Sequence, residues 1–126
     1  MPKILTVDDS AILRKIIAGC VQAMGYELLE AKDGLDALAV LSRCDVNDVA
    51  LILLDWNMPV MNGYEFLIRL KATEEFKRLK VMMVTTESEK TSVIQAIQAG
   101  ACHYITKPFT QEELSKRIME ALAKGV

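Results

Sequence analysis

Five side chains that could take part in chemistry stand at the ends of short apolar runs. Asp8 and Asp9 follow the first run, Asp55 follows the third, Thr85 closes the fourth, and Lys107 comes just after the fifth. If the runs are parallel β-strands, their carboxyl ends meet at one edge of the sheet, where ligands bind in open α/β folds. The spacing therefore predicts that three carboxylates, one hydroxyl and one ammonium group converge.

A cluster of three carboxylates favours a bound cation, the alternative being a proton taken up by one of the acids. Two carboxylates about 4 Å apart repel each other by roughly 4 kcal/mol at an effective dielectric constant near 20, so three pairs would repel by roughly 12 kcal/mol. That repulsion rivals the stability of a whole domain, which is about 5–15 kcal/mol. Carboxylate oxygens around an open position suit Mg²⁺, which also takes a phosphate oxygen as ligand. We therefore expect Mg²⁺ beside Asp8, Asp9 and Asp55.

The same residue types suit phosphoryl transfer to a carboxylate. Asp55 is the expected nucleophile, because an ionised carboxylate can attack phosphorus and form an acyl phosphate. Lys107 supplies a compact positive charge for one phosphoryl oxygen, and Thr85 can donate a hydrogen bond to another. Taken singly, each residue has a plainer interpretation as a turn, a helix cap or a strand-end hydroxyl. Their joint placement at the ends of four strands favours a phosphoryl site.

The elements that position these residues alternate between apolar runs and longer segments of helical periodicity, five times over. The runs predict strands at residues 4–7, 28–29, 51–54, 81–84 and 104–105. Amphipathic spacing predicts helices within residues 12–24, 35–41, 66–70, 93–97 and 114–122. Five βα units predict an α/β fold, a parallel sheet with helices on both faces. We expect residues 1–126 to form a single domain.

Capping signals place two helix ends. Gly25 follows the first periodic segment and is expected to end that helix. Thr110 is the expected N-cap of the last helix, with Glu113 at the third helical position of a capping box.

Composition limits the class of protein. The 126 residues are 52% hydrophobic and 25% charged, as in an ordinary globular domain. The formal net charge of −2 argues against a dedicated nucleic-acid binder. The apolar runs are far shorter than the roughly 20 residues of a membrane helix, and the first is too short for a signal peptide. We expect a cytoplasmic monomer that binds neither nucleic acid nor membrane.

Cysteine and histidine usage does not suggest a zinc site. Cys20, Cys44 and Cys102 are widely spaced, without a Cys-x-x-Cys pair, and His103 is the one imidazole. We expect the thiols to be reduced and buried. His103 is expected to be structural or solvent-facing and not a phosphoryl carrier, because the sequence offers no second imidazole and no obvious partner for it.

The motifs together resemble the receiver domain of two-component response regulators. They are Asp8-Asp9, Asp55-Trp56-Asn57-Met58-Pro59, Gly63, Thr85 and Lys107-Pro108-Phe109, and the similarity runs along essentially the whole chain. Within this family the chain is most similar to CheY-like single-domain chemotaxis regulators, because of Thr85-x-Glu87, Gln98-Ala99-Gly100-Ala101 and Tyr104. The resemblance implies a flavodoxin-like (βα)5 doubly wound sheet with the strand order 2-1-3-4-5 that CheY has.

The resemblance also implies a role for each residue at the site. Asp55 would accept the phosphoryl group of a histidine kinase. Asp9, Asp55 and the backbone carbonyl of Asn57 would bind Mg²⁺, with Asp8 contributing through a water molecule. Lys107 would contact the phosphoryl group, beside a cis peptide bond to the following proline. The chain would catalyse only its own phosphorylation and dephosphorylation.

A conformational switch is a further implication of the resemblance. Thr85 would move toward the phosphoryl group, and Tyr104 would then rotate inward. The output surface would be the face of the fourth helix, fifth strand and fifth helix, including Lys90, Tyr104 and Arg117. The expected partners are a histidine kinase, a downstream target such as the flagellar motor switch, and a phosphatase.

Other functions are compatible with parts of this pattern. The same chemistry would serve a phosphorelay intermediate or a phosphate sink. A phosphatase of the haloacid dehalogenase type also uses a strand-end aspartate with Mg²⁺, but its general acid would stand at Asn57, whose amide cannot deliver a proton. A flavin or nucleotide binder would need a glycine-rich loop where Asp8 and Asp9 stand.

Overall fold

The computed structural model describes residues 2–86 and 90–124, which form the predicted alternation of strands and helices. The strands are β1 (Lys3–Val7), β2 (Glu27–Ala31), β3 (Val49–Asp55), β4 (Val81–Thr86) and β5 (His103–Lys107). The helices are α1 (Ala11–Ala23), α2 (Gly34–Ser42), α3 (Gly63–Ala72), α4 (Lys90–Gln98) and α5 (Gln111–Ala123). A 3₁₀ helix, η1 (Val46–Asp48), was not predicted. Every strand is longer than its apolar run, because strand ends carry polar residues too.

The five strands form one parallel sheet in the order β2-β1-β3-β4-β5, which confirms the order implied by the resemblance. At the carboxyl edge Asp55 pairs with Val84, and Thr86 pairs with Lys107. Thr85 therefore lies on β4 one residue beyond the partner of Asp55. The register brings three of the predicted site residues onto adjacent strand ends.

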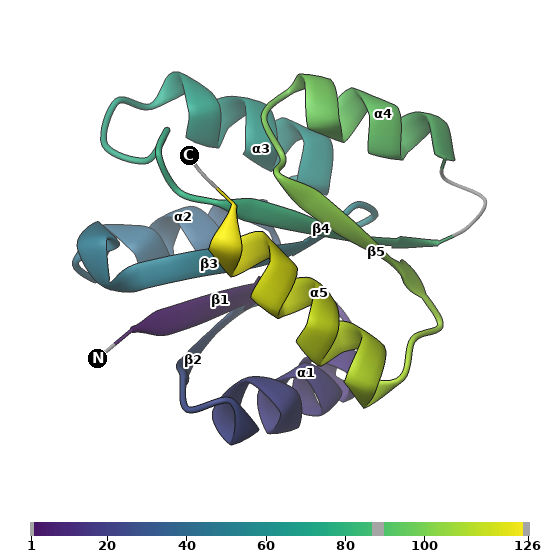
Figure 1. The fold of residues 1–126 in the computed structure, drawn as a ribbon. Helices are drawn as coiled ribbons and strands as arrows, with labels where there is room; N and C mark the ends of the chain where they lie inside the picture. Colours follow the sequence, from purple (N-terminus) through teal and green to yellow (C-terminus); the bar gives the residue numbers. More distant parts are fainter. Residues whose placement is uncertain (1, 87–89, 125–126) are drawn as a thin grey trace.

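Helices cover both faces of the sheet, with α2, α3 and α4 on one side and α1 and α5 on the other (Figure 1). Alternate residues of β3 pack into the two hydrophobic cores, one on each face of the sheet. Ile52 and Leu54 belong to the core under α2, α3 and α4. Leu51 and Leu53 belong to the core under α1 and α5. Because all four side chains are buried, β3 shows no polar alternation, as the sequence indicated.

Local signals explain where the helices begin and end. Gly25 lies just past α1 with φ 88°, as its predicted capping role requires. Thr110 caps α5 through a bond from the Glu113 backbone N–H, as predicted. The Glu113 carboxylate accepts from the Thr110 hydroxyl, whereas a complete capping box occurs at α3 between Asn62 and Glu65. That pattern was missed, although Asn-x-x-Glu is its sequence signal.

The structure corrects the prediction for the cysteines and agrees with the one for the histidine. All three thiols are free, but only Cys20 is buried, whereas Cys44 and Cys102 are partly exposed. His103 has a structural contact, because its Nε2 atom lies 2.9 Å from Glu120 Oε1. The pair joins β5 to the last turns of α5, and their separation of 17 residues hides it in the sequence. Within residues 2–86 and 90–124, no helix has the length and apolarity needed to cross a membrane.

Candidate functional site

Three carboxylates gather at the carboxyl edge of the sheet. Oxygen atoms of Asp8, Asp9 and Asp55 all lie within 4.8 Å of one another. Asp8 and Asp9 follow β1, and Asp55 is the last residue of β3, which is the strand next to β1. Asp8 and Asp55 are buried, whereas Asp9 is exposed. The cluster is open on the side of Asp9 and closed on the side of the sheet.

One ammonium group stands among these carboxylates. Lys107 Nζ lies 3.2 Å from Asp55 Oδ1 and 3.7 Å from Asp8 Oδ2. Three carboxylates and one ammonium leave a formal charge of −2. At the observed spacing each carboxylate pair still repels by roughly 3–4 kcal/mol at an effective dielectric constant near 20. The uncompensated charge matches that of a divalent cation.

Burial changes the acidity of Asp55. The removal of its carboxyl group from water, with the nearby Asp8 carboxylate, raises the pKa of Asp55 to about 6. Lys107 opposes the rise through its charge and its hydrogen bond. Asp55 is therefore ionised at neutral pH, as a nucleophile must be, but its charge destabilises the folded protein without a cation.

Asp8 has one oxygen that the described residues leave unsatisfied. Its Oδ1 atom accepts the Ser10 backbone N–H at 2.8 Å. Its Oδ2 atom is buried and has no hydrogen-bond donor among the described residues. A buried carboxylate oxygen without a donor is costly, and a cation or a cation-bound water would satisfy it. The donor set therefore fits a hard, oxygen-preferring ion such as Mg²⁺.

The loop after β3 packs closely on the first turn of α3. The Gly63 N–H donates to the Trp56 carbonyl oxygen at 2.9 Å. A Cβ atom at Gly63 would collide with the carbonyl oxygen of Asp55 and lie 2.9 Å from the Cα of Trp56. The absence of a side chain at Gly63 thus lets the helix approach the backbone of Asp55. Asn57 is exposed in this loop, two residues beyond Asp55.

The predicted switch residues lie on β4 and β5, the two strands beyond β3 in the sheet. Thr85 is buried at the end of β4, and Tyr104 is half-buried on β5. The Arg117 guanidinium lies 5.5 Å from the centre of the Tyr104 ring, and its Nη1 donates to the Tyr104 carbonyl oxygen at 3.4 Å. Lys90 opens α4, but its side chain, like the whole of Glu87, lies outside the described residues.

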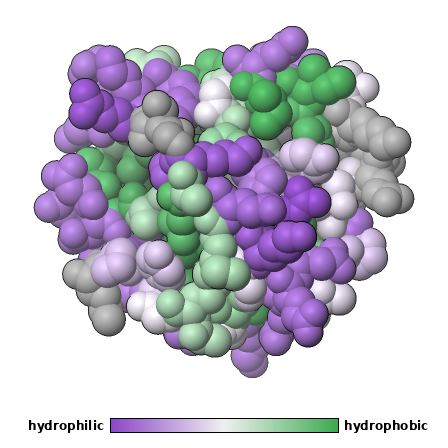
Figure 2. Space-filling model, viewed as in Figure 1, coloured by the Kyte–Doolittle hydropathy of each residue, from purple (hydrophilic) through white to green (hydrophobic). Residues whose placement is uncertain are grey.

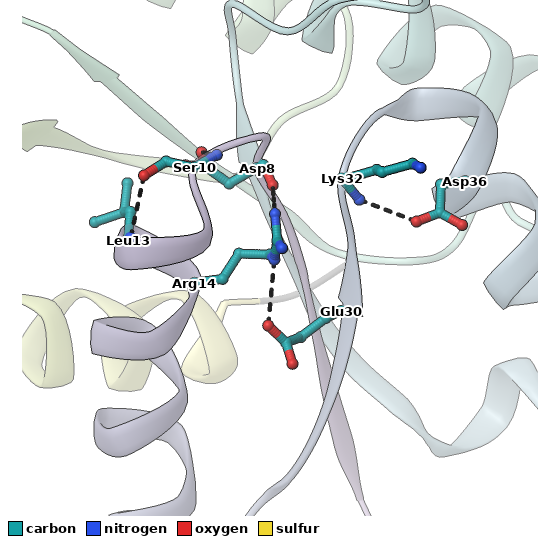
Figure 3. Close-up of polar contacts among 7 residues, drawn as sticks. All are labelled: Asp8, Ser10, Leu13, Arg14, Glu30, Lys32 and Asp36. Atoms are coloured by element: carbon teal, nitrogen blue, oxygen red, sulfur yellow. Dashed lines mark hydrogen bonds and ion pairs between the residues drawn. The ribbon is translucent and has the colours of Figure 1, made fainter.

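Arg14 and Glu30 were missed by the sequence reasoning. Arg14 donates to the backbone carbonyl oxygen of Asp8 at 2.6 Å and to Glu30 Oε1 at 3.3 Å (Figure 3). The sequence did contain one hint of Arg14, because a basic residue stands in the first turn of the helix that comes after the acidic pair. No feature of the sequence pointed to Glu30. It lies beside Arg14 only because β2 pairs with β1, and the sequence alone does not show which strands pair.

A sequence match to a known family agrees with this geometry. The sequence model of the response regulator receiver domain matches residues 4–119. The chain belongs to this family. Its receiver domain is 39% identical over 124 residues to a CheY homologue of Campylobacter jejuni, covering 98% of this chain and 94% of that one.

Solved structures give the same assignment. The receiver domain superimposes on the chemotaxis response regulator CheY4 of Vibrio cholerae with a TM-score of 0.87 and 34% identity, covering 96% and 98% of the two chains. It also matches the receiver domain of the sensor histidine kinase PA1611 of Pseudomonas aeruginosa, with a TM-score of 0.84 and 25% identity over 98% of both chains. The latter structure holds a magnesium ion in its active site cleft. This chain is a CheY-like receiver domain of two-component signalling, a signalling protein and not a conventional enzyme.

Proposed function

We propose that residues 1–126 form one receiver domain that acts as a phosphorylation-activated switch in chemotaxis. Asp55 accepts a phosphoryl group from a histidine kinase, and the changed face of α4, β5 and α5 then binds a target protein. The observation that carries this proposal is the position of the Asp55 carboxylate, 3.2 Å from the Lys107 ammonium and within 4.8 Å of two further carboxylates.

Mg²⁺ is the proposed metal, held by Asp9, Asp55 and the backbone carbonyl of Asn57, with Asp8 acting through a water molecule. The unsatisfied Asp8 Oδ2 and the charge of −2 support this assignment. When bound, Mg²⁺ neutralises charge on the carboxylates and on the incoming phosphoryl oxygens. The magnesium reported for the similar receiver domain of PA1611 supports the same choice of ion.

In the transfer step a carboxylate oxygen of Asp55 attacks phosphorus and forms a P–O bond. The bond from phosphorus to the imidazole nitrogen of the kinase histidine breaks, and the imidazole keeps the electron pair and takes up a proton. Lys107 contacts one phosphoryl oxygen and stabilises its charge. Thr85, buried at the end of the neighbouring strand, donates to another.

Labelling with a small phosphodonor tests the acceptor. Acetyl phosphate with Mg²⁺ is expected to add one phosphoryl group to the wild type and none to Asp55→Asn, because the amide is not a nucleophile toward phosphorus. Intact-mass measurement within minutes of mixing detects the product, and chelation of Mg²⁺ with EDTA should suppress it. Equal labelling of the two proteins would place the acceptor elsewhere.

The proposed output face combines exposed apolar side chains of α4 with the Tyr104 ring and the Arg117 guanidinium. Ile94 and Ile97 of α4 are 60% and 46% exposed. Figure 2 shows a hydrophobic patch at the upper right, over α4. Tyr104 and Arg117 lie on β5 and α5, and inward rotation of the Tyr104 ring would break its contact with the guanidinium. Phosphorylation, which adds about −1.5 to −2 charges, would favour the loop arrangement in which Thr85 reaches the phosphoryl group.

Target binding separates an output role from the alternatives. The beryllofluoride-bound form, a mimic of the phosphorylated protein, is expected to bind a flagellar motor-switch peptide at least about fivefold more tightly than the free form. Fluorescence anisotropy of a labelled peptide measures the two affinities, and Asp55→Asn mixed with beryllofluoride is the control. Equal affinities of the two forms would favour a phosphate sink or a phosphorelay intermediate.

A further inference from the structure

Arg14 lies behind the acidic cluster and contacts its backbone. Its side chain leaves the first turn of α1, and Nη1 donates to the carbonyl oxygen of Asp8 at 2.6 Å. Its Nε atom donates to Glu30 Oε1 on β2 at 3.3 Å. Figure 3 shows the guanidinium between these two groups. Arg14 thus joins α1, the end of β1 and β2 at the edge where the carboxylates gather.

The hydrogen bond from Arg14 is one of three that hold Asp8 in place. The Asp8 N–H donates to the Ala31 carbonyl oxygen at 3.0 Å, and Asp8 Oδ1 accepts the Ser10 N–H at 2.8 Å. With Arg14 on the carbonyl oxygen, Oδ2 is the only acceptor of Asp8 that has no donor among the described residues. That carbonyl belongs to the planar peptide unit joining Asp8 to Asp9, so its orientation determines where the Asp9 side chain starts.

We propose that Arg14 is a positioning residue of the Mg²⁺ site, an inference that rests on the proposed function. By holding the carbonyl of the Asp8–Asp9 peptide, the guanidinium keeps both carboxylates directed at the cation. Glu30 in turn keeps the guanidinium in place. Two nitrogens of one planar guanidinium serve the two acceptors, whereas a lysine offers a single nitrogen and is expected to replace only part of the contact. Outer contacts of this kind commonly orient metal ligands in proteins.

The charge of Arg14 and its positioning role predict opposite effects. As a cation near the site, Arg14 would repel Mg²⁺, and its removal would tighten binding. As a positioning residue, its removal would loosen the Asp8–Asp9 peptide and weaken binding. Since Glu30 neutralises much of the charge of Arg14, the positioning effect should prevail. The direction of the change therefore distinguishes the two roles.

Titration of the full chain with Mg²⁺, followed by the emission of Trp56, measures the affinity. Arg14→Met is expected to weaken Mg²⁺ binding about tenfold, and Arg14→Lys should recover part of the loss. Lys3→Met is the matched control, because Lys3 pairs with Glu27 and Asp48 at 3.8 and 3.7 Å at the opposite end of the strands. Its affinity for Mg²⁺ should equal that of the wild type.

Two further measurements complete the test. The Mg²⁺-induced rise in the midpoint of thermal unfolding gives a second readout, and a high-salt titration removes charge effects because salt screens them. Arg14→Gln replaces Arg14→Met if circular dichroism shows that the methionine variant does not fold.

The outcomes separate this inference from the function on which it rests. If the wild type binds Mg²⁺ and Asp55→Asn binds it more weakly, the metal site is supported whatever the role of Arg14. In that case, equal or tighter binding by Arg14→Met would overturn the positioning role alone. A loss that Arg14→Lys does not relieve would overturn it too. A wild type that does not respond to Mg²⁺ would contradict the metal site and the positioning role together.

Discussion

Asp55→Asn is expected to stabilise the cation-free protein by roughly 1–3 kcal/mol at about pH 7.5. Burial and the neighbouring carboxylate raise the pKa of Asp55 to about 6 from an ordinary value of 3.8. Below the lower value the group is protonated in both the folded and the unfolded protein and contributes nothing. Between the two values only the folded protein holds the proton, so its stability falls as the pH rises. Above about 6 the full penalty is present, and the amide removes it.

Urea unfolding of both proteins in EDTA, at two pH values, measures this effect. The stability difference should shrink to about half near pH 5, because the folded wild type then holds the proton. Mg²⁺ should stabilise the wild type more than Asp55→Asn, because the bound cation neutralises the repulsion among the carboxylates and the wild type has one carboxylate more. Asp9→Asn is a useful comparison: Asp9 is exposed and should give a smaller gain. A difference that does not vary with pH would contradict the crowded-carboxylate interpretation.

Gly63→Ala is expected to destabilise the protein by roughly 1–3 kcal/mol, a typical penalty of overpacking. The added methyl group would meet the carbonyl oxygen of Asp55 and the Cα of Trp56. Both are backbone atoms, one at the end of β3 and one in the following loop, and they cannot turn aside as a flexible side chain could. The helix must therefore shift away from the strand that carries the proposed acceptor, and phosphoryl labelling of Asp55 should slow as well.

Gly19→Ala provides the matched control. Gly19 is exposed within α1, and a Cβ atom there would meet no heavy atom within 4 Å. Alanine is favoured over glycine inside a helix by roughly 0.5–1 kcal/mol, so this variant should be more stable than the wild type. Thermal and urea unfolding should thus give opposite signs for the same chemical change at two glycines. A destabilisation of equal size at both positions would show that the contact at Gly63 is not the cause.

Local patterns in the sequence were sufficient to predict much of the fold. The continuous apolar run at residues 51–54 indicated a strand covered on both faces, and β3 is such a strand. The capping residues Gly25 and Thr110 were visible because caps depend on a few neighbouring residues. The alternation of strands and helices also brought the carboxylates to one edge, because parallel strands end together.

Contacts between distant segments were decided only by the tertiary structure. Strand order came from the family resemblance, because periodicity does not say which strands are neighbours. The pairing of β1 with β2 places Glu30 beside Arg14, and the packing of α5 on β5 places Glu120 beside His103. Residue types and their order along the chain thus determined which groups could do chemistry. Burial raised the pKa of Asp55 and left an oxygen of Asp8 unsatisfied, because both effects depend on what the folded chain packs around a charge.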